Sequence, residues 1–95
     1  MSETISKTST ITAAPGQVSS TVEGEAVILN METGVYYGLN PVGAWVWEAL
    51  QAPQTLGSLI DGLVAEFEVE PDRAEQDLRA LLEDLASASL IEVKG

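Results

Sequence analysis

The spacing of apolar residues changes at Asn40-Pro41, and this change limits what the chain can fold into. Before it, short runs rich in β-branched and aromatic residues alternate with glycine-containing turns, which predicts antiparallel strands at residues 17–22, 26–31 and 35–39. After it, apolar residues recur at helical spacing. Because a three-stranded sheet is not stable alone, we expect helices from the second half of the chain to cover one of its faces.

Three helices are predicted after this boundary. Each begins with an asparagine or threonine that can cap free amide groups, or with a proline, which a first turn tolerates. The expected bounds are residues 41–50, 56–67 and 70–88, followed by a short final strand or extended tail at residues 90–93. This order predicts an α+β domain of the winged helix-turn-helix type, in which a three-stranded antiparallel sheet is followed by three helices and a possible short final strand.

Residues 1–16 are expected to form a flexible N-terminal tail, and residues 17–95 the folded domain. The first segment is rich in serine and threonine and closes with Ala-Ala-Pro-Gly, a composition typical of mobile ends. Two other interpretations stay open, a tag remnant and a threonine-rich edge strand. If the segment is a tail, removing residues 1–14 should leave the function of the domain intact.

Charge and composition exclude several classes of function. Fifteen acidic residues against four basic ones give a net charge of −11, which disfavours binding to nucleic acid or to an anionic membrane. The chain has no cysteine and no histidine, so it lacks thiol nucleophiles, the usual zinc ligands and the usual general base. We therefore expect no enzyme activity, cofactor or metal. The absence of a long apolar run or signal-peptide pattern favours a cytoplasmic protein.

The third predicted strand contains two adjacent tyrosines and offers a route to peptide binding. Because successive strand residues point to opposite faces, Val35, Tyr37 and Leu39 are expected on one side and Tyr36 and Gly38 on the other. As the last strand of a meander, it keeps one unpaired edge, which can accept a strand from another chain. The alternative is that one tyrosine belongs to the core and the other to an inert surface.

The residues of this strand and its surroundings resemble a known family. The segment from Val27 to Ala44, followed by Trp47, contains Gly-Val-Tyr-Tyr-Gly-Leu-Asn-Pro and resembles the PqqD-like proteins, also called RiPP recognition elements after the ribosomally made, post-translationally modified peptides they serve. Residues 77–85, ending in Ser89-Leu90-Ile91, look like the third helix of that family and its exit. The family usually has glycine where Ser89 stands. The resemblance covers about residues 17–93.

The resemblance implies a non-catalytic protein that binds the leader peptide of a precursor as an added strand and delivers it to separate enzymes. A free-standing chain with an acidic third helix looks like the recognition protein of lasso peptide biosynthesis, which works beside a cysteine-protease-like leader peptidase and an ATP-dependent macrocyclase. One alternative is the peptide chaperone of pyrroloquinoline quinone biosynthesis. Another, from a different class, is a winged-helix DNA-binding regulator, which the acidic third helix disfavours.

The expected peptide site is a groove between the third strand and the third helix. Its strand residues are Val35, Tyr36, Tyr37, Gly38 and Leu39. Its helix residues lie along one side at spacings of three and four, and they are Ala74, Asp77, Leu78, Leu81 and Asp84. Apolar leader side chains are expected beside the two leucines, and the two aspartates could attract a basic residue. The alternative is that both leucines belong to the core.

Overall fold

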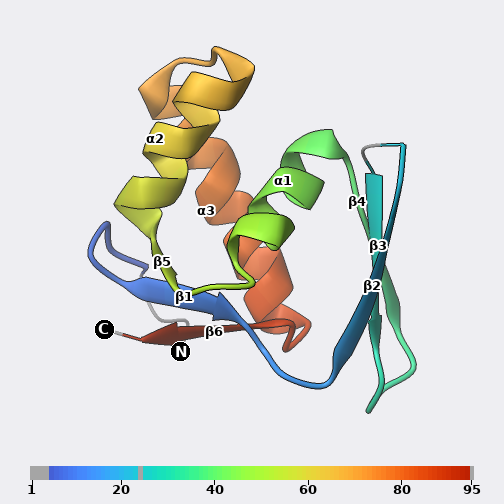
Figure 1. The fold of residues 1–95 in the computed structure, drawn as a ribbon. Coiled ribbons are helices and arrows are strands. Elements are labelled where there is room, and N and C mark those ends of the chain that lie inside the picture. The colour runs from blue at the N-terminus through green and yellow to red at the C-terminus, as the bar shows by residue number, and fades with distance from the viewer. Residues whose placement is uncertain (1–4, 24, 95) are drawn as a thin grey trace.

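The described part of the chain folds into two small antiparallel sheets and three helices (Figure 1). The computed structural model describes residues 5–23 and 25–94 of the chain. Along the sequence, the elements are β1 (Thr10–Ala13), β2 (Gln17–Val22), β3 (Glu25–Asn30), β4 (Tyr36–Leu39), α1 (Pro41–Ala49), β5 (Gln54–Thr55), α2 (Leu56–Phe67), α3 (Pro71–Ser87) and β6 (Ile91–Lys94). The predicted α+β order of three strands, three helices and a final strand is thus confirmed.

The predicted meander is the sheet with strand order β2-β3-β4. Its strands pair antiparallel in continuous register, for example Ala26 with Leu39 and Ile28 with Tyr37. The turn between β3 and β4 contains Gly34 at a φ of 74°, in the left-handed region that favours glycine. This geometry lets the Gly34 N–H donate to the Asn30 carbonyl oxygen at 2.8 Å, which closes the hairpin.

A second sheet has the order β5-β1-β6, with β1 as its middle strand (Figure 1). The expectation of a flexible tail over residues 1–16 is therefore wrong for Thr10–Ala13, which pairs with β5 on one side and β6 on the other. Ile11 has no exposed surface, so burial as well as backbone pairing holds the strand. The interpretation as a threonine-rich strand was closer, although β1 is not an edge. Residues 1–4 lie outside the described part of the chain.

The helices begin where their capping residues predict. The Asn40 side chain accepts a hydrogen bond from the Gly43 N–H at 2.8 Å and caps α1. The Thr55 hydroxyl does the same for α2, accepting from the Ser58 N–H at 3.1 Å. Helix α3 begins at Pro71 without a side-chain cap. Each capping side chain accepts from an N–H group three residues later, so a free amide is satisfied at two of the three helix starts.

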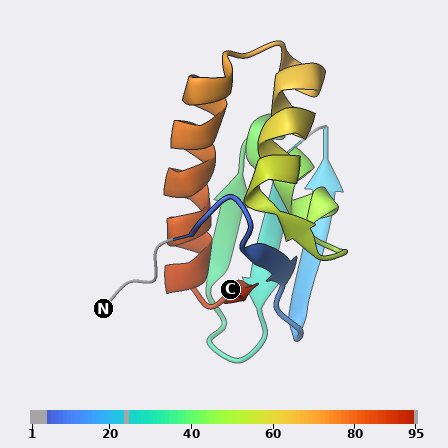
Figure 2. The same ribbon diagram turned by 90° about the vertical axis from the view of Figure 1, so that its left-hand side faces the viewer.

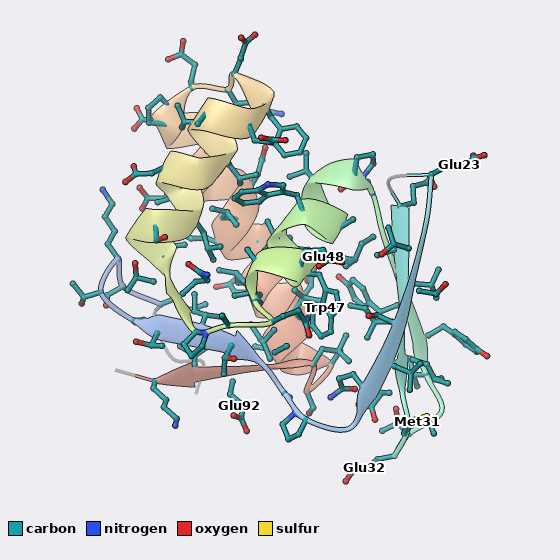
Figure 3. All side chains as sticks on the ribbon, in the orientation of Figure 1. Glu23, Met31, Glu32, Trp47, Glu48 and Glu92 are labelled. Atoms are coloured by element: carbon teal, nitrogen blue, oxygen red, sulfur yellow. The ribbon has the colours of Figure 1, made fainter. Side chains whose placement is uncertain are left out.

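The hydrophobic core lies between the helices and the inner faces of the two sheets. Its side chains without exposed surface come from every layer, and they include Ile11, Ile28, Val46, Leu82 and Leu85. Helix α1 covers one face of the β2-β3-β4 sheet, while none of the helices in the described residues lies over the opposite face (Figure 1). The labelled Trp47 lies on the side of α1 toward this sheet (Figure 3). The meander therefore has an inner face buried by helices and an outer face left open.

Candidate functional site

Strand β4 forms an edge of its sheet, and in the described part of the chain its one strand partner is β3. The Asn30 N–H donates to the Val35 carbonyl oxygen at 3.0 Å, so Val35 directs its backbone toward β3. Backbone groups alternate in direction along an antiparallel strand. Tyr37 and Leu39 therefore also face β3, whereas Tyr36 and Gly38 direct their N–H and C=O groups to the free edge.

The side chains of β4 alternate between the two faces of the sheet. Leu39 is in the core and Tyr37 is half-buried, so both point inward, whereas Tyr36 is 70% exposed on the outer face with Gly38. Val35 precedes the strand, which begins at Tyr36, and its side chain is exposed, so its place on the inner side stays a prediction. The side chains of Tyr36 and Tyr37 thus lie on opposite faces of the sheet.

Only part of the side of α3 expected to face β4 is available to a ligand. Asp77 and Asp84 are exposed, and Leu81 is half-buried. Ala74 and Leu78 lie in the hydrophobic core, at 2% and 1% exposure, so their side chains serve the fold. Among the apolar residues expected to line the helix side of the site, Leu81 alone keeps more than a trace of exposed surface.

The structure brings β4 and α3 together at Tyr37 and Asp84. The pKa of the Tyr37 hydroxyl is raised, first by partial burial and then by the negative charge of the Asp84 carboxylate and a hydrogen bond to it. Since an aspartate can only accept, the tyrosine hydroxyl is the donor. Tyr37, on the inward face of β4, thus lies close to Asp84 in the C-terminal half of α3, which lies behind α1 in Figure 1 and at the left in Figure 2.

Asn30 links the β3–β4 turn to the end of α3, although it was not among the predicted site residues. Its side-chain oxygen accepts from the Glu32 and Thr33 N–H groups at 2.9 and 3.3 Å. Its side-chain nitrogen donates to the carbonyl oxygen of Ala88, directly after α3, at 3.4 Å. The β3–β4 turn is therefore fastened to the end of the helix. An asparagine four residues before a turn glycine was the available sequence signal, since asparagine side chains often bond the backbone of a turn.

The opposite flank of α3 is attached to the N-terminal segment. Arg79 forms an ion pair with Glu75 at 2.9 Å, and its guanidinium also donates to the Ile5 carbonyl oxygen. Lys7 lies 3.6 Å from Glu75. The hydrogen bond from Arg79, followed by the positive charges of Lys7 and Arg79, lowers the pKa of Glu75. Helix α3 is thus attached on both flanks, to Ile5 and Lys7 on one side and to the β3–β4 hairpin on the other.

Two further features concern ligands and membranes. Across residues 5–23 and 25–94, no group of three or more acidic, cysteine or histidine side chains could hold a metal ion. In the same part of the chain, no helix has the length and apolar character needed to cross a bilayer. The groups that this site does offer are backbone donors and acceptors at an open strand edge, with tyrosine, leucine and carboxylate side chains beside them.

These features define a small α+β domain of winged-helix type with an open strand edge beside its third helix. The chain belongs to the PqqD family, because the model of that family, described as coenzyme PQQ synthesis protein D, matches residues 25–91. The resemblance seen in the tyrosine-containing strand and the third helix is thereby confirmed. A comparison with curated protein sequences gives no match.

Two solved structures share the fold. TbiB1, determined in complex with the TbiA(beta) leader peptide, is 33% identical, with a TM-score of 0.79 over 85% of this chain and 94% of its own. A lasso peptide synthetase B1, also complexed with a leader peptide, is 24% identical, with a TM-score of 0.75 over 86% of this chain and 96% of its own. The fold described above is therefore one that both of these proteins adopt.

Proposed function

We propose that this protein binds the leader peptide of a ribosomally made precursor as an added strand on β4. The observation that carries the proposal is the free edge at Tyr36 and Gly38, which faces away from β3 and lies beside α3. It is supported by the identity of 33% over most of the chain to TbiB1, whose structure contains a leader peptide. Strand addition at an exposed edge is a common way to hold an extended peptide.

The site would bind the leader through both backbone groups and side chains. Tyr36 and Gly38 would exchange backbone hydrogen bonds with the leader, an interaction that does not depend on its sequence. Leader side chains on the inner face would lie beside Tyr37 and Leu81, which keep partly exposed apolar surface. Asp77 and Asp84 would attract a basic leader residue, with an effect of at most about 1 kcal/mol because both carboxylates are exposed. Affinity would come from the strand edge and specificity from these four side chains.

We infer that the protein has no chemistry of its own and delivers the bound peptide to separate enzymes. In lasso peptide biosynthesis these would be a cysteine-protease-like leader peptidase and an ATP-dependent macrocyclase, both met in the cytoplasm. The lack of cysteine and histidine in the sequence fits a protein that presents a peptide and does not cut it. Purified protein should leave the precursor intact and should raise the rate at which the peptidase cleaves it.

Amide NMR shifts of the labelled protein, recorded while a synthetic leader peptide is added, test the site. The peptide should come from the precursor gene encoded beside this chain. We expect the largest changes at residues 35–39 and in the half of α3 that contains Leu81 and Asp84. Changes confined to α2 would place the peptide elsewhere and contradict the proposal.

A second candidate is the peptide chaperone of pyrroloquinoline quinone biosynthesis, which the description of the matching family model favours. The same edge would serve either peptide, so the fold does not separate the two pathways. Titrating the protein with a lasso leader and with a pyrroloquinoline quinone precursor peptide, under equal conditions, distinguishes them. We expect the lasso leader to bind more tightly, and the reverse order would assign the protein to the other pathway.

A further inference from the structure

Asn30 connects the two sides of the proposed site, β4 and α3, at the end where the β3–β4 turn lies. Among the described residues, Ser9 and Asn30 are the buried polar ones, and Asn30 keeps 6% of its surface exposed. Its backbone N–H donates to Val35 and its carbonyl oxygen accepts from Gly34, so its main chain belongs to the hairpin. Its side chain leaves the hairpin and donates to the Ala88 carbonyl oxygen after α3. A buried polar side chain bonded in this way fixes the position of the parts that it joins.

The link made by Asn30 continues along α3 and returns to the sheet. The Ala88 N–H donates to the Asp84 carbonyl oxygen at 3.1 Å, within the last turn of the helix. The Asp84 carboxylate accepts from the Tyr37 hydroxyl of β4. Tyr37 in turn pairs with Ile28 of β3, two residues before Asn30. These bonds form a closed ring that contains both sides of the site, so α3 cannot move away from β4 without breaking one of them.

Few hydrogen bonds join the meander to α3, which packs mainly against α2 and β6. Besides the bonds of Tyr37 and Asn30, the Gln17 side chain donates to the Ser89 carbonyl oxygen after the helix. That bond is 3.5 Å long and exposed, so water competes with it and it constrains the helix little. Asn30 is therefore the main polar link between the meander and the exit of α3.

The bond from Asn30 to Ala88 should affect the position of α3 more than the stability of the protein. At 3.4 Å it is long, and a long hydrogen bond is weak. A strand added to β4 would pair with the backbone at Tyr36 while its side chains lie beside Leu81 of α3. A small outward movement of the helix would leave one of these two contacts unmade. A spacing that is set before the peptide arrives raises affinity, because binding does not have to impose it.

We propose that Asn30 is a positioning residue, which holds α3 at the distance from β4 that the leader strand requires. The proposal rests on the proposed function for the identity of the ligand. Asn30 is buried and acts through Ala88 and Asp84, not through contact with the peptide. If loss of the link leaves the site correctly spaced about one-tenth of the time, the apparent Kd for the leader rises about tenfold.

Two variants remove the donor to Ala88 and keep an acceptor for the β3–β4 turn. Asn30→Asp retains an oxygen for the N–H groups of the turn and replaces the side-chain nitrogen with a second oxygen. Asn30→Ser adds no charge, can still bond the turn, and has a side chain too short to extend to Ala88. Gln76→Glu makes the same amide-to-carboxylate change at an exposed position of α3 and is the matched control.

Three measurements are made on each variant. Fluorescence anisotropy gives the affinity for a labelled synthetic leader peptide, and thermal melts followed by circular dichroism show whether the variant is folded. The third measurement follows the pKa of Tyr37 through the carbon NMR shift of labelled tyrosine, without peptide. A role in stability alone would leave this pKa unchanged in the folded protein. The exposed Tyr36 is the internal reference, and its signal should match that of the wild type.

We expect both Asn30 variants to fold and to bind the leader about tenfold more weakly, with Gln76→Glu within about twofold of the wild type. The pKa of Tyr37 should fall in both Asn30 variants, because α3 moves away and the Asp84 carboxylate no longer raises it. Wild-type affinity or an unchanged Tyr37 pKa in the folded variants would overturn the proposal. Loss of the fold in both would make Asn30 a residue of the core and would also refute it.

Two other results would assign the effect to charge. A loss of affinity in Asn30→Asp without one in Asn30→Ser would show that a buried carboxylate, not the missing donor, is responsible, and an equal loss in Gln76→Glu would show a general effect of negative charge. Either result would contradict the positioning role. If the wild-type protein does not bind the leader, the proposed function fails, and the Tyr37 pKa then decides by itself whether Asn30 sets the spacing of β4 and α3.

Discussion

Replacing Gly38 with proline should abolish most leader binding and leave the fold in place. The Gly38 N–H points to the free edge of β4, so its removal breaks no bond to β3. A Cβ atom at this position meets no atom within 4 Å, and the φ of Gly38 lies outside the left-handed region. Proline is tolerated on edge strands when its nitrogen faces solvent. The residue before it, Tyr37, is already extended, as a residue before proline must be.

The size of the effect follows from the hydrogen bond that is lost. The leader carbonyl that would accept from Gly38 is left without a partner inside the complex, which costs about 1–3 kcal/mol. Since 1.4 kcal/mol corresponds to a tenfold change in Kd, the expected loss of affinity is about five- to 150-fold. The proline ring also occupies the space of the N–H hydrogen, where the added strand would approach, so we expect the upper part of this range.

Gly38→Ala is the matched control, because it adds a Cβ in open space and keeps the N–H donor. Its leader affinity, measured by anisotropy with a labelled synthetic peptide, should stay within about twofold of the wild type. Circular dichroism and thermal melts show whether the proline variant is folded. Wild-type affinity in a folded Gly38→Pro variant would refute strand addition at β4. An equal loss in Gly38→Ala would show that side-chain volume, not the backbone donor, decides binding.

Four substitutions test stability, each measured by urea unfolding followed through tryptophan fluorescence. Ser89→Gly should stabilise the protein by about 1 kcal/mol, because Ser89 has a φ of 62°, which is unfavourable for any residue with a Cβ. Gly62→Ala should lower the stability of the protein, since the new Cβ would lie 2.4 Å from the Trp45 ring. Gly57→Ala should raise the stability by up to about 1 kcal/mol through helix propensity, because the nearest atom to its new Cβ is 3.5 Å away. Ile11→Ala should cost about 2–5 kcal/mol, and a change under about 0.5 kcal/mol would contradict the burial of β1.

The elements that the sequence predicts well are those specified by neighbouring residues. Asn40 and Thr55 start helices through hydrogen bonds to an amide three residues later, and Gly34 supplies a turn backbone that other residues rarely adopt. The end of α3 is also specified locally, because Ser89 has a left-handed backbone at the position after the helix where the family usually has glycine. Such signals need no knowledge of the tertiary fold.

The candidate site could be predicted only in part, because a pattern along a helix does not say what each position faces. Spacings of three and four place Ala74, Leu78 and Leu81 on one side of α3. How the helix is rotated against its neighbours then decides that the first two are buried in the core and that Leu81 stays partly exposed. The edge of β4 was predictable, since the last strand of a meander has one free edge whatever the packing.

The position of β1 in the middle of a second sheet could not be predicted, because its partners are far away in the sequence. The segment Thr10–Ala13 has strand-forming residues, but it pairs with Gln54–Thr55 and Ile91–Lys94, and no turn links it to either. Strand β1 is linked to the helices beside the site. The Ala13 N–H donates to the Leu50 carbonyl oxygen after α1, and β6, which pairs with β1, follows α3 in the chain. The strand thus joins the ends of the two helices that flank the inner side of β4.

Removing residues 1–14 should therefore not leave leader binding intact, as a mobile tail would have allowed. The deletion takes away the middle strand of the β5-β1-β6 sheet and the buried Ile11, and with them the contacts of Ile5 and Lys7 to α3. Leader affinity would fall through loss of the fold, with no contact between this segment and the peptide. A truncated protein that unfolds with normal cooperativity and binds the leader with wild-type affinity would show that β1 has no such role.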